Sequence, residues 1–214
     1  MNTDLISYYR QRASEYEKIY QKPERQSDLL RAADLLQELL SGTSLLEIAC
    51  GTGYWTERLA PVCKNIHATD INEAVLEIAR SKEYGLTPVC FETVDFFDSQ
   101  LDGNYDAVFG GFILSHITYE TLSAFFRRLE ELVPSGGTIV LIDNLYVEGN
   151  SHPIVKTDEG GNTYQQRQLR DGSVHLVLKN FHAEEVLIDV LQGKANEIRA
   201  IELEYFRILH YKKK

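Results

Sequence analysis

The fold of this chain is decided by Leu45-Leu46-Glu47-Ile48-Ala49-Cys50-Gly51-Thr52-Gly53-Tyr54-Trp55-Thr56. An apolar run enters a turn with two glycines, and apolar residues then resume at helical spacing, which predicts a strand, a tight loop and a helix. Glycine permits positive φ and lets a ligand approach the backbone, and the helix start offers free N–H groups at its positive dipole end. We therefore expect a ligand of nucleotide or carboxylate character at this loop.

Two nucleotide-binding families share this arrangement, and the spacing of the glycines separates them. A dinucleotide fold requires Gly-x-Gly-x-x-Gly, whereas Thr56 stands at the third glycine position and Glu47 lies within the preceding strand. The order Glu-x-Ala-x-Gly-x-Gly resembles motif I of the class I S-adenosylmethionine-dependent methyltransferases, with Ala49 at the usual first glycine. The resemblance implies S-adenosylmethionine as cofactor and S-adenosylhomocysteine as product. An NAD-dependent oxidoreductase is the disfavoured alternative.

The same resemblance implies an α/β fold, a Rossmann-like doubly wound sheet of seven mostly parallel strands with strand seven antiparallel. It extends to Pro134-Ser135-Gly136-Gly137 before an apolar strand, and so covers residues ~45–143. We expect one domain over residues 1–214, with a helical cap or lid (1–41), a cofactor-binding core (42–143), and a substrate-side loop with C-terminal strands (144–214). Residues 144–170 read as a long surface connection, and 173–179 with 198–211 as strands six and seven.

Acidic residues follow two of the predicted core strands. Asp70 ends the second strand, where one carboxylate can accept both ribose hydroxyls; an ordinary helix cap is the alternative. In the family that this chain resembles, an acid at the position of Asp95 accepts the adenine amino group and the N–H of Phe96 meets a ring nitrogen, although a turn carboxylate is also possible. The predicted cofactor-binding residues of the core are Glu47, Ala49, Gly51, Gly53, Trp55, Asp70, Ile71, Asn72, Asp95, Phe96, Gly111 and Phe112.

The N-terminal segment carries tyrosines at helical intervals. Its pattern Tyr-Tyr-x-x-Arg-Ala-x-x-Tyr resembles the cap of small-molecule methyltransferases, which closes over the methionine end of the cofactor. Tyr9, Arg12 and Tyr16 are therefore candidates for contact with the cofactor carboxylate or the substrate. Aromatic packing on a surface helix is the alternative.

Three residues are candidate bases for methyl transfer. His116 titrates near neutrality and stands after the fourth strand, though it can equally be a hydrogen-bonded residue at a helix entrance. Asp143 and His152 are weaker candidates. Asp143-Asn144 also raises a Mg²⁺-dependent mechanism, but Gly110-Gly111-Phe112 stands where the main metal ligand is expected, so we predict no metal.

Composition limits the possible partners. The formal net charge of −10 argues against a nucleic-acid surface, and no run approaches the ~20 apolar residues of a membrane span. The first residues have neither a basic start nor an apolar signal core, so we expect a cytoplasmic protein. The preferred hypothesis is methyl transfer to a small-molecule substrate. A non-catalytic module that binds S-adenosylmethionine is the alternative, and the oligomeric state is open.

Overall fold

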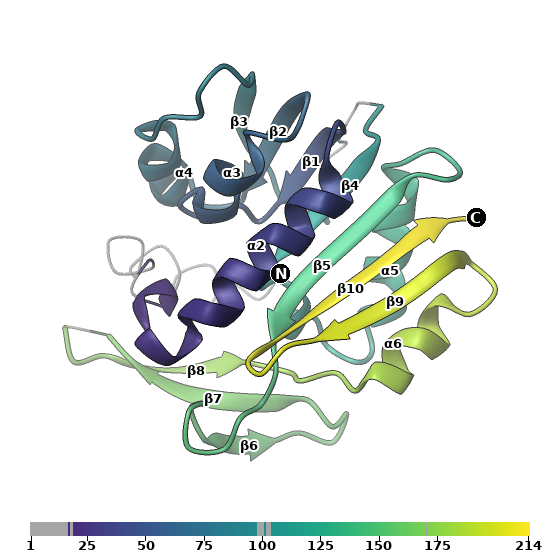
Figure 1. Ribbon diagram of the computed structural model, residues 1–214. Helices are drawn as coiled ribbons and strands as arrows, with labels where there is room; N and C mark the ends of the chain where they lie inside the picture. Colours follow the sequence, from purple (N-terminus) through teal and green to yellow (C-terminus); the bar gives the residue numbers. More distant parts are fainter. Residues whose placement is uncertain (1–16, 18, 98–100, 102–103, 170) are drawn as a thin grey trace.

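Seven strands form the central sheet in the order β3-β2-β1-β4-β5-β10-β9 (Figure 1). The computed structural model describes residues 17, 19–97, 101, 104–169 and 171–214. The first five strands are parallel to their neighbours, whereas β10 runs antiparallel to both β5 and β9. This confirms the predicted sheet with its antiparallel seventh strand. The strands are β1 Ser44–Ile48, β2 Asn65–Asp70, β3 Val89–Thr93, β4 Ala107–Gly111, β5 Thr138–Asn144, β9 Ala195–Glu202 and β10 Phe206–Lys213.

Helices cover both faces of this sheet. Figure 1 shows α2 crossing the near face, with α5 behind the sheet. Helix α2 is buried at four positions spaced by three or four residues, which makes one apolar stripe along it. The helical segments are η2 Pro23–Arg25, α2 Gln26–Leu40, α3 Tyr54–Leu59, α4 Glu73–Arg80, η3 Leu114–His116, α5 Leu122–Glu131 and α6 Glu184–Leu191.

Alternation along the buried strands divides the core into two clusters. Leu45 and Phe109 face α2 and α3, whereas Leu46 and Val108 face α5 and α6. Successive side chains of a strand point to opposite faces, so strands covered by helices on both sides are apolar at every position. Glu47 is an exception to this rule, because it is a carboxylate within the buried run of β1.

The region after β5 differs from the prediction. Residues 144–170 are not a plain connection, because β6 (Ile154–Thr157) and β7 (Thr163–Gln168) pair with β8 (Val174–Leu178) in a separate antiparallel sheet. The segment 173–179 therefore does not supply strand six, and the predicted strand over 198–211 is a hairpin of β9 and β10. The alternation in β8 is typical of any amphipathic strand and does not specify which sheet it joins.

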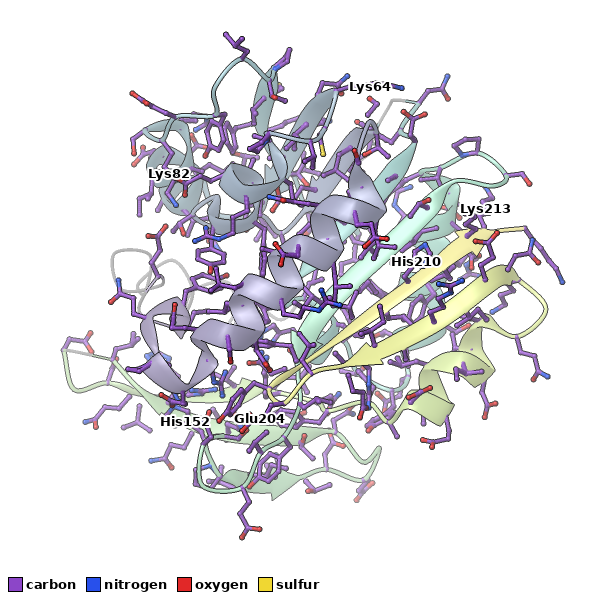
Figure 2. All side chains as sticks on the ribbon, viewed as in Figure 1. Lys64, Lys82, His152, Glu204, His210 and Lys213 are labelled. Carbon is purple, nitrogen blue, oxygen red and sulfur yellow. The ribbon has the colours of Figure 1, made fainter. Side chains whose placement is uncertain are left out.

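The small sheet lies beside the end of β5 (Figure 1). Figure 2 shows His152 and Glu204 at this end of the molecule, and Lys64 and Lys213 at the opposite end. The carboxyl ends of β1, β4 and β5 therefore open toward the small sheet, and ligands collect at this edge in doubly wound sheets. None of the helices in the described ranges has the length and apolar character needed to cross a membrane.

Candidate active site

The glycine loop after β1 has the left-handed backbone that its sequence predicts. Gly51 and Gly53 have φ of 58° and 78°, and Gly53 precedes the first residue of α3. Ala49 also has a positive φ of 52°, in a region that side chains with a Cβ seldom adopt. The loop is fixed to β2 because the Cys50 N–H donates to the Thr69 carbonyl at 2.9 Å. Alanine thus adopts the conformation of a glycine here.

Asp70 is held against this loop by main-chain hydrogen bonds. Its Oδ2 accepts the Gly51 N–H at 3.0 Å, and its Oδ1 accepts the Asn72 N–H at 2.9 Å. Burial raises the pKa of Asp70 to about 6, and the N–H groups of Asn72, Gly51 and Ile71 oppose that rise. Each carboxylate oxygen retains a second lone pair. The tip of β2 therefore offers an oriented double acceptor next to the glycine loop.

Glu47 is almost completely buried on the face of β1 that meets α3. Burial raises its pKa to about 8; the Thr56 hydroxyl opposes this rise, and the Asp70 carboxylate adds to it. Glu47 Oε2 and Trp55 Nε1 are buried without a hydrogen-bond partner. Buried polar atoms are normally paired, so two unpaired ones beside a glycine loop indicate that a polar ligand completes this site.

Aromatic rings line the other side of the loop. Tyr20 stacks on Tyr54 with ring centroids 3.5 Å apart, and Trp55 lies between the Tyr54 and Phe112 rings. Phe112 has a φ of 61° immediately after β4. A Cβ at Gly111 would lie 2.7 Å from Trp55 Cδ1, so the absent side chain makes room for the indole ring.

The other predicted cofactor residues lie at the ends of β2 and β3. Asn72 is buried and its Oδ1 has no partner, while Ile71 lies beside it between β2 and α4. Asp95 Oδ1 accepts the Phe97 N–H at 3.0 Å, which closes a turn. Phe96 is buried against Phe97 and Phe125. Asp95 and Phe96 therefore lie just after β3, at the edge of the sheet. Their contact with a cofactor stays a prediction.

Two of the three candidate bases lie together, between the ends of β4 and β5. His116 Nδ1 donates to the Leu178 carbonyl at 2.7 Å, because a carbonyl can only accept. Burial, together with the nearby Lys179 ammonium, lowers the pKa of His116 to about 3. His116 is therefore neutral near pH 7 and holds an additional proton weakly, which argues against the predicted role as a general base.

Asp143 forms a buried ion pair instead of serving as an open base. Lys179 Nζ lies 3.2 Å from Asp143 Oδ1 and 2.5 Å from Ser115 Oγ, and the Ser115 N–H donates to Asp143 Oδ2. Burial alone would raise the pKa of Asp143, but the Lys179 ammonium and the Ser115 N–H outweigh it and hold the pKa below its ordinary value. A carboxylate so engaged is a poor proton acceptor.

His152 is separate from this group. It is exposed on the segment before β6, and its carbonyl accepts a hydrogen bond from the Gln165 side chain at 2.6 Å.

The Asp143-Asn144 pair, considered above as a possible metal site, is engaged in protein contacts, because the Asn144 side-chain oxygen accepts a hydrogen bond from Arg25 Nη1 at 3.0 Å. Within the described ranges, no group of three histidines, cysteines or carboxylates is arranged to hold a metal.

The structure adds basic residues that the sequence reading did not single out as functional. Arg167 of β7 and Arg25 of η2 both lower the pKa of the buried Lys179 through their charges, and Lys22 is affected by both arginines. The Lys179 ammonium donates to Asp143 and Ser115, which leaves one of its three N–H groups for a ligand. A local basic group thus lies beside the carboxyl end of β5, in a chain whose formal net charge is −10.

Comparisons with known proteins agree with this geometry. Residues 46–139 match a family model described as a methyltransferase domain. A solved structure described as the DhpI-SAM-HEP complex is 28% identical, with a TM-score of 0.80 and 99% of each chain covered. A DhpI-SAH complex is 27% identical and covers 98% of this chain and 95% of that one, also with a TM-score of 0.80. This chain belongs to the class I S-adenosylmethionine-dependent methyltransferases.

The curated relatives leave the acceptor of this methyltransferase open. A malonyl-[acyl-carrier protein] O-methyltransferase of Bacillus anthracis is 29% identical over 106 residues, which are 49% of this chain and 37% of that protein. The mouse N-terminal Xaa-Pro-Lys N-methyltransferase 1 is 30% identical over 137 residues, covering 57% of this chain and 60% of that protein. The chain spans less than half the length of the first two curated relatives that it matches.

S-adenosylmethionine is the cofactor of this methyltransferase, and the residues present fit it. The double acceptor of Asp70 suits a diol, and the unpaired Glu47 Oε2 lies in the same loop region. Tyr9, Arg12 and Tyr16 lie outside the described residues, so the predicted cap contacts stay predictions.

Lys179 was not predicted to be functional, because a lysine in a pattern of alternating polar and apolar residues is read as exposed to solvent and not as buried. The available signal was its position at the end of the alternating run Ser173–Lys179. Its ion pair with Asp143 depends on the docking of the small sheet, which local sequence does not reveal.

Proposed function

We propose that this methyltransferase transfers a methyl group to an anionic oxygen of a small acid. The proposal rests on the buried Lys179 ammonium at the carboxyl end of β5, which has one N–H left for a ligand. Arg167 and Arg25 lie close enough to lower the pKa of this ammonium. A buried cation with a free donor is suited to a carboxylate or a phosphate-like group, because charged hydrogen bonds are the strong ones. Arg167 belongs to β7 of the small sheet, and Lys179 is the residue that follows β8.

The state of the candidate bases supports the same acceptor class. When bound, S-adenosylmethionine supplies an electrophilic methyl group. A neutral hydroxyl or ammonium acceptor would need a base, but His116 has a pKa of about 3 and Asp143 is engaged by Lys179. An acid is already deprotonated near pH 7, so its oxygen can attack without one. In this proposal His116 is a neutral polar residue, while Lys179 binds and orients the acid.

The cofactor side is assigned to the residues at the ends of β1 to β4. We assign Asp70 to the ribose hydroxyls, Asp95 and Phe96 to the adenine, and the loop of Gly51 and Gly53 to the methionine portion. Ala49, Trp55, Ile71, Asn72, Gly111 and Phe112 complete the predicted lining. The geometry of Asp70 and the unpaired buried atoms of the loop support this assignment.

A screen with matched acceptors tests the proposal. Small carboxylic, phosphoric and phosphonic acids are each paired with their neutral amide, and transfer from methyl-labelled S-adenosylmethionine is followed by mass spectrometry. We expect label on acids and not on the amides. Equal labelling of the amides would contradict the proposal, and cofactor binding without transfer to any acid would favour the non-catalytic alternative.

Variants of the basic group then test its role. Lys179→Gln and Arg167→Gln should raise KM for the acid by about tenfold or more, since a hydrogen bond to a charged group contributes about 1.5–3 kcal/mol. Lys64→Gln is the matched control, because Lys64 is exposed at the opposite end of the molecule and pairs with Asp106 at 3.6 Å. If neither Lys179→Gln nor Arg167→Gln changed KM, the basic group would have no role in binding the acceptor.

A further inference from the structure

Arg25 is a cation that lies almost completely inside the protein. It is the last residue of η2, directly before α2, and its residue exposure is 9%. Its guanidinium lies over the Tyr205 and Phe206 rings, 5.2 and 5.7 Å from their centroids. Burying a charge is costly unless the charge is well hydrogen-bonded, so the partners of Arg25 indicate what its burial achieves.

Those partners are two side-chain amides from distant parts of the chain. Arg25 Nη1 donates to Asn144 Oδ1 at 3.0 Å, while Nε donates to Asn150 Oδ1 at 2.9 Å and Nη2 donates to the same oxygen. A guanidinium holds its donors in a rigid plane, which the single ammonium of a lysine does not reproduce. Arg25 therefore fixes η2 to the last residue of β5 and to the segment that follows it.

The Asn144 amide continues this chain of hydrogen bonds to Asp143. Its oxygen accepts from Arg25, and its Nδ2 donates to Asp143 Oδ1 at 3.2 Å. The reversed amide would place its N–H groups against the guanidinium and its oxygen against the carboxylate, so that neither hydrogen bond could form. Arg25 thus selects the orientation in which Asn144 donates to Asp143.

Asp143 Oδ1 accepts from Asn144 and from Lys179 at the same time. The Asn144 main-chain N–H lies 2.7 Å from this oxygen, its Nδ2 lies at 3.2 Å, and Lys179 Nζ also lies at 3.2 Å. A carboxylate oxygen has two lone pairs, so the two N–H groups of Asn144 already suffice to occupy it. Lys179 is held in addition by Ser115 Oγ at 2.5 Å. Asn144 therefore limits how closely Asp143 can engage the ammonium.

We propose that Arg25 is a positioning residue for methyl transfer, which holds the Asn144 amide on Asp143 and so leaves Lys179 with an N–H for the acid. Without this support, Asp143 Oδ1 can take a closer hydrogen bond from Lys179, and the ammonium is drawn toward its counter-ion and away from the acceptor. Arg25 acts through Asn144 and does not itself contact the acid. This inference rests on the proposed role of Lys179 in binding the acceptor.

Kinetics with the acid that the acceptor screen identifies test the proposal. At saturating S-adenosylmethionine, Arg25→Met and Asn144→Ala should each raise KM for the acid by about three- to tenfold with little change in kcat, as expected when one hydrogen bond in binding is weakened. Arg25→Lys should not restore the wild-type KM, because it keeps the charge without the rigid plane of donors. Arg31→Gln, at an exposed position of α2, is the matched control and should leave KM unchanged.

A double-mutant cycle separates positioning from a merely structural role. If Arg25 acts through Lys179, adding Arg25→Met to Lys179→Gln should change KM by less than about twofold, which is the range of independent additivity errors. Asn144→Ala leaves Arg25 bonded to Asn150 and supplies the same cycle should Arg25→Met fail to fold. An unchanged KM in the single variants, or the same factor with and without Lys179, would overturn the proposal.

An NMR pH titration of the Lys179 ammonium requires no acceptor. Its signal is identified by its loss in Lys179→Gln. Burial lowers the pKa of Lys179 and the Asp143 carboxylate raises it, so a closer Asp143 should raise the pKa. Asn144→Ala and Arg25→Lys keep a positive charge at residue 25 and should both show this rise, whereas Arg31→Gln should not.

The two measurements distinguish this proposal from the proposed function. A Lys179 pKa that is the same in wild type, Asn144→Ala and Arg25→Lys would overturn the positioning role. A raised pKa in both variants, together with no methyl transfer to any acid, would contradict the proposed acceptor and still support the positioning of Lys179 by Arg25.

Discussion

Replacing Asp143 by asparagine leaves the Lys179 ammonium buried beside a neutral amide. The two side chains of the pair are 10% and 9% exposed, and Lys179 Nζ lies 3.2 Å from Asp143 Oδ1. Breaking a buried pair by removing one partner costs about 3–5 kcal/mol, because the remaining charge is left uncompensated. For a chain of this length that cost corresponds to a fall in Tm of about 6–20 °C.

A double-mutant cycle separates this cost from the net contribution of the pair. Replacing both partners, Asp143→Leu with Lys179→Met, removes both charges and should be within about 2 kcal/mol of the wild type. Urea unfolding at pH 7 measures Asp143→Asn, the two single variants Asp143→Leu and Lys179→Met, and the double variant that combines them. The reasoning is refuted if Asp143→Asn costs less than about 1 kcal/mol, or if the double variant is as destabilised as the sum of the single ones.

The same pair predicts a pH dependence. Because the pKa of Asp143 is below its ordinary value in the folded chain, its contribution is complete above the ordinary aspartate pKa and is lost as the pH falls through the lowered value. Urea unfolding of the wild type and of the uncharged double variant, compared from pH 6 downward, should show a larger acid-induced loss of stability in the wild type, which has the pair.

Three further predictions concern the glycine loop and its neighbours. Ala49→Gly should stabilise the protein by about 0.5–1 kcal/mol, because alanine is strained at φ 52°, whereas the control Ala33→Gly within α2 should cost about 1 kcal/mol in the same urea assay. Gly111→Ala should cost about 1–3 kcal/mol, because its Cβ would lie 2.7 Å from the Trp55 ring, and an unchanged Tm would show that the indole moves freely. Glu47→Gln should stabilise the free protein by about 2–4 kcal/mol at pH 8 and by much less at pH 5. The pKa of Glu47 is about 8 in the folded chain and lower in the unfolded chain, so the wild type loses stability as the pH rises between these two pKa values. Equal effects of the substitution at both pH values would contradict this.

The cofactor half of the fold could be predicted because its signals are local. The run from Leu45 to Ile48 is apolar as a buried parallel strand must be, and Gly51 and Gly53 mark the loop where positive φ is required. Asp70 follows from its position at a strand tip. Each of these inferences depends on a few consecutive residues, and the structure has the seven-stranded, mostly parallel sheet with an antiparallel seventh strand that their resemblance implied.

The region around the small sheet could not be predicted to the same extent, because its place in the fold depends on long-range docking. Asn180 joins the residue after the small sheet to the segment after β4, donating to the Ile117 carbonyl at 2.9 Å while its N–H donates to the Ser115 carbonyl. Sequence alternation does not distinguish β8 from a strand of the central sheet. The pKa of His116 is equally non-local, because it depends on Lys179, which is 63 positions later in the chain.

The central claim is that the glycine loop and Asp70 bind S-adenosylmethionine, and equilibrium binding to wild type and Asp70→Ala tests it most directly. S-adenosylmethionine and S-adenosylhomocysteine should both bind the wild type, and Asp70→Ala should weaken them by about tenfold or more, because a hydrogen bond to a charged group contributes about 1.5–3 kcal/mol. NAD should bind poorly in the same assay. Unchanged affinity in Asp70→Ala, or tight binding of NAD, would contradict the account.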